Sequence, residues 1–201
     1  MKPEQCLDLS LLDPSLNDAS AINEIAGIIR QGGVIAYPTE AVWGIGCNPW
    51  NRSAVYRVLE IKTRPVEKGV ILIGCSEDQF APLLDPLSRE DRAKLTGSWP
   101  GPHTWVIPDP DGWVPEWVKG QFDSVAVRVS AHPTVQEICR AVGYPIISTS
   151  ANRAGSEPLL NLSDVEQEFN TALDAIVDGE TGPQGIPSQI RDLRSGKIIR
   201  P

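Results

Sequence analysis

Gly33-Val-Ile-Ala-Tyr-Pro-Thr-Glu-Ala-Val-Trp-Gly-Ile-Gly-Cys47 is the stretch around which this chain is organised. Its first apolar residues, 34–37, have the length and composition of a buried strand. Pro38 has no N–H to donate to a neighbouring strand, so the strand is predicted to end there. Thr39 and Glu40 then lie just past a strand end, which is where open α/β sheets bind ligands.

Two glycines, Gly44 and Gly46, close this stretch. They either let the backbone approach another group closely or adopt a positive φ. Taken alone, the stretch is equally compatible with a strand and a turn inside an ordinary core, so the rest of the chain decides its meaning.

The composition is that of one acidic globular protein. The chain has 201 residues, 41% hydrophobic and 22% charged, which is enough for one sizeable core. Its net charge of −8 disfavours general nucleic-acid binding, because phosphate neutralisation supplies most non-specific affinity. We find no apolar run of about 18 residues and no signal-peptide pattern, so we predict a cytoplasmic protein without a membrane span. The four cysteines contain no CxxC pair and are interpreted as free thiols, and a zinc site is not expected.

Helical and strand periodicities alternate along most of the chain, which predicts one α/β domain over residues 1–201. Two hairpin-like regions predict that its sheet is mixed, with some antiparallel strands. Residues 1–17 are predicted as a loop or edge segment, and 108–120 as an ordered surface loop. Helices are predicted at 18–31 (capped by Asn17 or Asp18), 51–62, from the capping-box spacings at 76–79 and 163–166, at 88–95 and at 133–143; strands at 69–74, 104–107, 124–129, 145–149, 175–177 and 188–190, with 197–200 returning as a hairpin partner.

The first candidate for chemistry is Lys62-Thr-Arg-Pro65, at the end of a predicted helix. Two cations two residues apart, stiffened by a proline, suit a polyphosphate, and Lys68 adds a third cation. The alternative is solvated charge that favours a helix C-terminus.

Arg128 and a group of small polar residues form the second candidate. Arg128 lies in the middle of a valine-rich strand, so its face must be a wet cleft or must hold a partner anion. Ser148 and Ser150 share one strand face, and Asn152 follows them. Such hydroxyls suit carboxylate or phosphate oxygens, although strand-end turns favour the same residue types. We find no P-loop and no GxGxxG motif.

Taken together, these motifs resemble the YrdC-like family. The resemblance is carried, in order, by Tyr37-Pro-Thr-Glu-Ala-Val-Trp-Gly-Ile-Gly46, Lys62-Thr-Arg-Pro65, Trp99-Pro-Gly-Pro102, Val127-Arg128-Val129 with His132-Pro133, Ser148-Thr-Ser-Ala-Asn152 and Pro187-Ser188. It covers the chain from about residue 18 to the C-terminus, within the single domain predicted for 1–201.

The resemblance implies a twisted, open, mixed α/β sheet with a concave cationic cavity. It also implies condensation of L-threonine, bicarbonate and ATP into L-threonylcarbamoyladenylate, with release of pyrophosphate. Mg²⁺ is expected to accompany ATP, as in other nucleotidyl transfers. That product would feed the modification of tRNA through separate threonylcarbamoyl-transfer proteins, so that tRNA is an indirect partner.

The resemblance further implies roles for individual residues. Lys62 and Arg64 are the expected catalytic residues. Those expected to bind threonine are Thr39, Arg128, Ser148 and Ser188, and those expected to bind ATP are Lys62, Arg64, Lys68, Ser124, Ser150, Asn152 and Arg200. Longer members of the family carry a histidine on the threonine side at the position of Ile73, which is predicted here to pack inward.

The physical chemistry of the reaction agrees with this resemblance. N-carboxythreonine and ATP are both anions, so their reaction needs fixed cations and close positioning more than it needs a nucleophile or an acid–base pair. The alternatives are an RNA-binding or ribosome-assembly factor without turnover, and a nucleotide-binding regulator. The acidic composition and the lack of interleaved basic and aromatic residues disfavour RNA binding.

Overall fold

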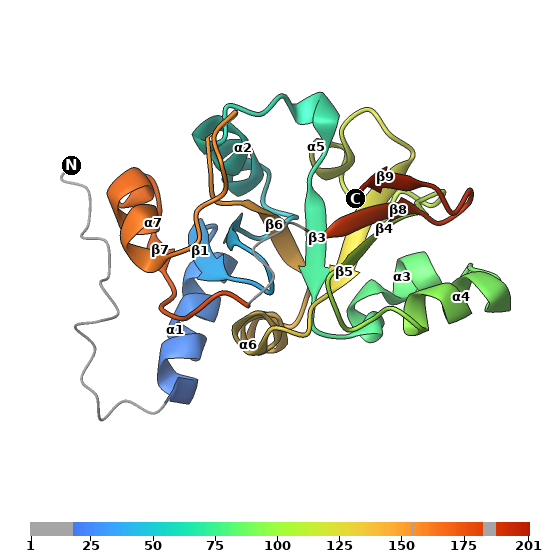
Figure 1. Cartoon of the computed structure of the whole chain (residues 1–201), viewed down its shortest axis with the longest axis horizontal. Helices are drawn as coiled ribbons and strands as arrows, with labels where there is room; N and C mark the ends of the chain where they lie inside the picture. Colours follow the sequence, from blue (N-terminus) through green and yellow to red (C-terminus); the bar gives the residue numbers. More distant parts are fainter. Residues whose placement is uncertain (1–17, 154, 183–187) are drawn as a thin grey trace.

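A twisted mixed sheet of nine strands runs through the part of the chain that the computed structural model describes, residues 18–153, 155–182 and 188–201 (Figure 1). Its strand order is β7-β1-β2-β6-β3-β5-β4-β8-β9. Three neighbouring pairs, β1–β7, β3–β5 and β4–β8, are parallel, and the others are antiparallel, so the prediction of a mixed sheet is confirmed. The strands are β1 (Ile35–Pro38), β2 (Trp43–Gly46), β3 (Ile71–Gly74), β4 (His103–Pro108), β5 (Ser124–Val129), β6 (Ile146–Ser150), β7 (Ala175–Ile176), β8 (Gln189–Asp192) and β9 (Ile198–Arg200).

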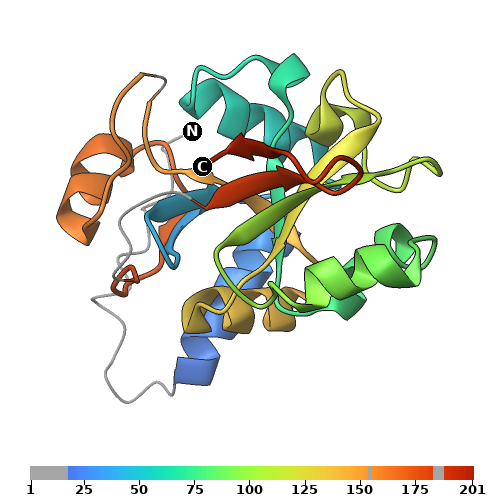
Figure 2. The same ribbon diagram turned by 45° about the vertical axis from the view of Figure 1, so that its right-hand side comes forward.

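Helices cover both faces of this sheet. They are α1 (Asp18–Arg30), α2 (Arg52–Ile61), α3 (Ala81–Leu84), α4 (Arg89–Thr96), α5 (Glu116–Lys119), α6 (Pro133–Val142) and α7 (Leu162–Phe169), with 3₁₀ turns η2 (Val66–Lys68) and η3 (Glu77–Phe80). In both views α1 and α6 lie side by side on one side of the sheet, and α2 lies on the other (Figures 1 and 2). The described helices include none that is long and apolar enough to cross a bilayer.

The opening stretch forms a β-hairpin, where the sequence predicted a single strand and a turn. β1 pairs antiparallel with β2, and Pro38 is the last residue of β1, opposite Trp43. The glycines of β2 make room for the ring of Tyr37: a Cβ on Gly46 would lie 2.9 Å from Tyr37 Cε1 and 2.3 Å from the carbonyl oxygen of Ile147. Of the two expected reasons for these glycines, close approach is therefore the correct one.

The two sheet faces carry separate hydrophobic clusters, which follow from the period-two alternation of strand side chains. Leu72 and Val127 belong to the cluster that includes residues of α2. Ile73 and Ile146 belong to the cluster built with α1 and α6. Each fully buried side chain of this size contributes roughly 1.5–3 kcal/mol of transfer free energy. Each sheet face is therefore stabilised by its own hydrophobic cluster. The face that carries Ile73 and Ile146 is also the face on which the candidate site lies.

Two capping boxes predicted from sequence are wrong. Ser76 makes no side-chain cap and is followed by the 3₁₀ turn η3. Gln79 instead accepts from the Cys75 N–H at 2.9 Å and donates to the Cys139 carbonyl at 2.7 Å, so its amide links the residue just after β3 to α6. At α7 the cap is Asn161 rather than Ser163, because the Asn161 side chain accepts from the Asp164 N–H at 3.0 Å.

Segment 108–120 is more regular than the predicted loop, because it contains α5. Asp109 organises this segment: it accepts from the backbone N–H groups of Trp113 and Val114, and its Oδ2 lies 2.7 Å from Lys119 Nζ. The ion pair is almost fully buried.

The remaining predicted elements are confirmed to within a few residues. α2 is capped by the Asn51 side chain, which accepts from the Ala54 N–H at 3.1 Å, and the β8–β9 hairpin turns at Gly196 with φ of 69°. The predictions for residues 1–17, including the Asn17 cap and Cys6, and for Pro187 lie outside the described residues. Cys47, Cys75 and Cys139 are free thiols, as expected.

Candidate functional site

A cavity of about 720 Å³ opens on the same sheet face that α1 and α6 pack against, in the part of this face that the two helices leave uncovered. Ile71 lines this cavity, whereas Ile73, two residues further along the same face, is fully buried in the cluster with α1 and α6. Every site residue predicted from sequence lines the cavity: Thr39, Lys62, Arg64, Lys68, Ser124, Arg128, Ser148, Ser150, Asn152, Ser188 and Arg200. The structure therefore brings together residues from separate motifs spread along the chain.

The end of α2 delivers two of the cations. Lys62 is the C-terminal cap of α2, and the next residue, Thr63, has a φ of 49°. A β-branched residue in this region is strained, and such strain persists only where the surrounding structure fixes it. Here the Arg64 N–H bonds the Leu59 carbonyl at 2.8 Å, which closes the turn. The strained residue separates Lys62 from Arg64 and directs both into the cavity wall.

Lys62 is buried and held by neutral oxygen atoms. Its Nζ donates to the carbonyls of Ser150 at 2.5 Å and Asn152 at 2.6 Å, and to Asn152 Oδ1 at 2.5 Å. Burial, and then the charge of Arg64, lowers the pKa of Lys62 to about 8. The ammonium therefore ties the end of β6 to the end of α2 while remaining partly titratable near neutral pH.

Two guanidinium groups are likewise anchored by carbonyls. Arg64 Nε donates to the Gly69 carbonyl at 2.9 Å, and Arg200 Nη2 donates to the Ser188 carbonyl at 2.7 Å. Burial lowers the pKa of both, and the charges of Arg128 and Arg64 lower that of Arg200 further. These neighbouring cations repel one another, so the cavity attracts anions.

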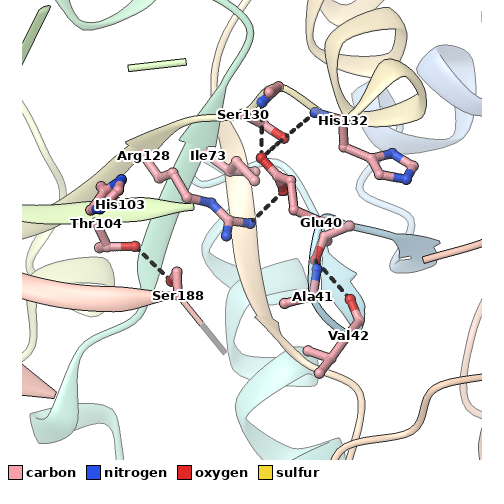
Figure 3. Close-up of polar contacts among 12 residues, drawn as sticks. Glu40, Ala41, Val42, Ile73, His103, Thr104, Arg128, Ser130, His132 and Ser188 are labelled. Atoms are coloured by element: carbon pink, nitrogen blue, oxygen red, sulfur yellow. Dashed lines mark hydrogen bonds and ion pairs between the residues drawn. The ribbon is translucent and has the colours of Figure 1, made fainter. Parts of the chain in front are cut away.

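Arg128 has a carboxylate partner, which the sequence did not identify. Its Nη2 lies 3.5 Å from Glu40 Oε2, and the two side chains are only 6% and 12% exposed. Glu40 Oε1 in turn accepts from Ser130 Oγ and from the Ala131 N–H, each at 2.8 Å. Figure 3 shows Glu40 between Arg128 and the start of α6. Of the two expectations for Arg128, the structure thus provides a partner anion as well as a cavity.

The hydroxyl groups gather near Arg128. Thr39 Oγ1 donates to the Val42 carbonyl at 2.7 Å, and Ser188 Oγ lies 2.9 Å from Thr104 Oγ1 (Figure 3). Ser148 lines the cavity beside them. The nearby Tyr37 hydroxyl donates to the Ile147 carbonyl at 3.1 Å, and burial raises the pKa of Tyr37 well above its ordinary value. Ile73 is buried, as predicted, and is paired with Arg128 across β3 and β5.

The remaining predicted site residues also lie in the cavity wall. Ser150 Oγ donates to Asn152 Oδ1 at 2.7 Å, and Asn152 Nδ2 donates to the Ser156 carbonyl at 2.5 Å. Lys68 and Ser124 line the wall. The described lining holds basic side chains (Lys62, Arg64, Lys68, Lys119, Arg128 and Arg200) against a single carboxylate, Asp192. A cationic cavity therefore exists inside a chain whose net charge is −8.

Sequence reasoning missed Thr104 and Lys119 as parts of this region and assigned Glu40 no contact or role. Glu40 was placed correctly past a strand end, but its pairing with Arg128 depends on the tertiary approach of β5. The period of strand β4 puts Thr104 on the face of Val106, a signal that points to the cavity only once the sheet order is known.

This geometry defines a class: a mixed α/β protein with an open-sheet cavity for small anionic ligands. Comparison with known proteins gives its family. The chain belongs to the Sua5/YciO/YrdC family, whose sequence model, described as "Telomere recombination", matches residues 27–201.

Two similar curated relatives share one name. Threonylcarbamoyl-AMP synthase of Cellvibrio japonicus is 49% identical over 95% of this chain and 100% of its own length. The protein of the same name from Pseudomonas aeruginosa strain PAO1 is 53% identical over 88% of this chain and 94% of its own.

Solved structures agree on the fold. P. abyssi Sua5, in a crystal structure described as complexed with L-threonine, is 32% identical with a TM-score of 0.83 over 89% of this chain. The present chain spans about half the length of that protein, 52%. E. coli YciO matches with a TM-score of 0.82 at 23% identity over 92% of this chain and 90% of its own, which supports the fold alone.

Proposed function

We propose that this chain is a threonylcarbamoyl-AMP synthase, which condenses L-threonine, bicarbonate and ATP into L-threonylcarbamoyladenylate and releases pyrophosphate. The names of its relatives, at about half identity over most of the chain, support this reaction. The structural observation that carries the proposal is that two kinds of group line one cavity. Lys62, Arg64 and Arg200 hydrogen-bond to neutral carbonyls, and Arg128 lies with several hydroxyls, of which Ser188 also contacts Arg200.

The reaction joins two anions, which explains the cations. The threonine amine and bicarbonate form a carbamate with loss of water, and a carbamate oxygen then attacks the α-phosphorus of ATP, so that pyrophosphate leaves. Lys62, Arg64 and Arg200 provide fixed positive charge where negative charge accumulates on the phosphates. Since carbonyls already orient these groups, little reorganisation is needed as the reaction proceeds.

The threonine end provides complementary groups for the amino acid. Arg128 is the partner for the carboxylate, and Thr39, Ser148 and Ser188 offer hydroxyls for the side-chain oxygen and the amine. Holding the labile carbamate beside ATP replaces a rare encounter with an intramolecular one, which is worth several kcal/mol of activation free energy.

Mg²⁺ is expected to enter with ATP. No cluster of three or more metal-ligating side chains occurs among the described residues, and Asp192 is the only carboxylate in the described lining. Phosphate oxygens and water fit such a site better than a protein cage does, because Mg²⁺ keeps several waters and binds substrate phosphates. Bound in this way, the ion would neutralise phosphate charge.

We place this reaction in the cytoplasm, where it would supply separate proteins that transfer the threonylcarbamoyl group to tRNA. The chain would then contact tRNA indirectly. This chemistry also explains why an acidic chain contributes to RNA modification: its product is a small adenylate.

Steady-state pyrophosphate release tests the proposal. Release should require both threonine and bicarbonate, and omission of either should reduce it to background. ATP turnover that is indifferent to threonine would contradict the proposal, as would salt-sensitive RNA binding without turnover.

A further inference from the structure

Glu40 is buried against the cavity but does not line it. Arg128 lines the cavity, and Glu40 lies behind it, 3.5 Å from Nη2 through Oε2. Oε1 is occupied by Ser130 Oγ and the Ala131 N–H. Oε2 itself is buried without a hydrogen-bond partner among the described residues, as is Arg128 Nε. Glu40 can therefore act on a ligand only through its charge and through Arg128.

The surroundings make this charge effective. Ile73, fully buried, is the neighbour of Arg128 on β3 and continues into the apolar cluster under α1 and α6. Charges at an apolar boundary interact more strongly than charges in water, because the effective dielectric constant is lower. The positive charge of Arg128 is thus compensated by one carboxylate that solvent reaches poorly.

Of the other cavity cations, Lys119 also has a buried carboxylate partner, Asp109, but Lys62, Arg64 and Arg200 have none among the described residues. The described hydrogen bonds of the Lys62, Arg64 and Arg200 side chains all go to neutral oxygens. Lys62, Arg64 and Arg200 thus have no carboxylate partner among the described residues, whereas Arg128 has one, even though Arg200 lies near enough for the charge of Arg128 to act on it. Polyanionic ATP suits the unpaired cations, and a zwitterionic amino acid suits the Arg128–Glu40 pair.

We infer that Glu40 is a specificity-determining residue: by neutralising Arg128 it makes the threonine end accept a net-neutral amino acid and reject simple anions. This inference rests on the proposed function. Glu40 would disfavour the binding of competing anions, and such disfavouring of the wrong ligand is a common way for a site to discriminate between related ligands. Without Glu40, Arg128 would be one more free cation and would attract phosphates or carboxylates that lack an ammonium group.

Calorimetric titration with two ligands tests this directly. (R)-3-Hydroxybutyrate is threonine with its ammonium group replaced by hydrogen, so it keeps the methyl, hydroxyl and carboxylate groups but is an anion. The Kd ratio of hydroxybutyrate to threonine should fall by about tenfold or more in Glu40→Gln, as expected for the loss of one charge near the carboxylate. Glu40→Asp keeps the charge and should retain most of the discrimination.

A matched control separates the effect of the charge at Glu40 from the effect of the net charge of the protein. Glu137 is exposed on α6, and Glu137→Gln makes the same change in net charge. Its ratio should equal that of the wild type; an equal fall in both glutamine variants would overturn the inference. So would an unchanged ratio in folded Glu40→Gln.

A measurement on the unaltered protein covers the case in which Glu40→Gln does not fold. Inorganic phosphate should not displace threonine from the wild-type protein, and displacement would overturn the inference. If the wild-type protein binds no threonine at all, the proposed function fails and this inference fails with it. If the wild-type protein binds threonine but the Kd ratio is unchanged in Glu40→Gln, the inference about Glu40 fails and the proposed function stands.

Discussion

Replacing Arg64 by alanine should abolish most activity while leaving a folded protein. The side chain makes two hydrogen bonds, from Nε to the Gly69 carbonyl at 2.9 Å and from Nη2 to the Lys68 carbonyl at 3.3 Å. Their loss should cost about 1–3 kcal/mol of stability, since a net hydrogen bond contributes roughly 0.5–1.5 kcal/mol. The effect on rate should be larger, because a fixed donor to developing charge is typically worth about 2.7–4 kcal/mol, or a hundred- to a thousandfold.

The assay is pyrophosphate release at saturating threonine and bicarbonate, with thermal unfolding measured in parallel. Arg64→Lys keeps the charge but loses the planar fork and should lie between the alanine variant and the wild type. Arg52 serves as the control, because it lies over the rings of Tyr56 and Trp117 and is absent from the cavity lining. Arg52→Ala should keep its activity. A folded Arg64→Ala protein with nearly wild-type turnover would refute the assignment of Arg64.

Three further predictions follow from the same geometry. Arg128→Leu should abolish threonine binding and should cost about 3–5 kcal/mol of stability, because it leaves Glu40 as a buried unpaired charge. Adding Glu40→Gln to this variant should restore stability in denaturant titrations but should not restore threonine binding. Restored binding would contradict the role of Arg128. The pKa of Lys62 is about 8 in the folded protein against 10.5 for an ordinary lysine, so between these pH values the unfolded chain binds more protons and the free energy of unfolding should rise with pH. Lys62→Met should remove this contribution to the pH dependence of stability. An identical pH dependence in the variant would mean that the pKa is not lowered. Serine should react less efficiently than threonine by about 1–3 kcal/mol in kcat/KM, the usual worth of one methyl group in a pocket, and equal values would show that no methyl pocket exists.

Local signals predicted the elements that have strong local causes. The alternation in Ser124–Val129 and the helix predicted over 51–62 both depend on residues near one another in sequence, and both were predicted correctly. The capping box predicted at Ser76 does not form, because the Gln79 amide hydrogen-bonds Cys75, just after β3, and Cys139 in α6. These contacts require tertiary structure. The strand β2 was missed because its two glycines resemble a turn until the Tyr37 ring that they accommodate is in place.

The candidate site shows the same division. The cavity residues were selected by motif resemblance, and the structure places them all around one cavity. Glu40 was not assigned a contact, since its partners Arg128, Ser130 and Ala131 are about 90 residues away in the chain. Pairings at that separation depend on sheet order, which local patterns do not encode.

Mass spectrometry can identify the product that forms when the protein is mixed with ATP, threonine and isotope-labelled bicarbonate. We expect L-threonylcarbamoyladenylate that carries the bicarbonate label in its carbamoyl carbon, formed in equal amounts with pyrophosphate. AMP or ADP without a threonine adduct, or an adduct without the label, would contradict the proposed function.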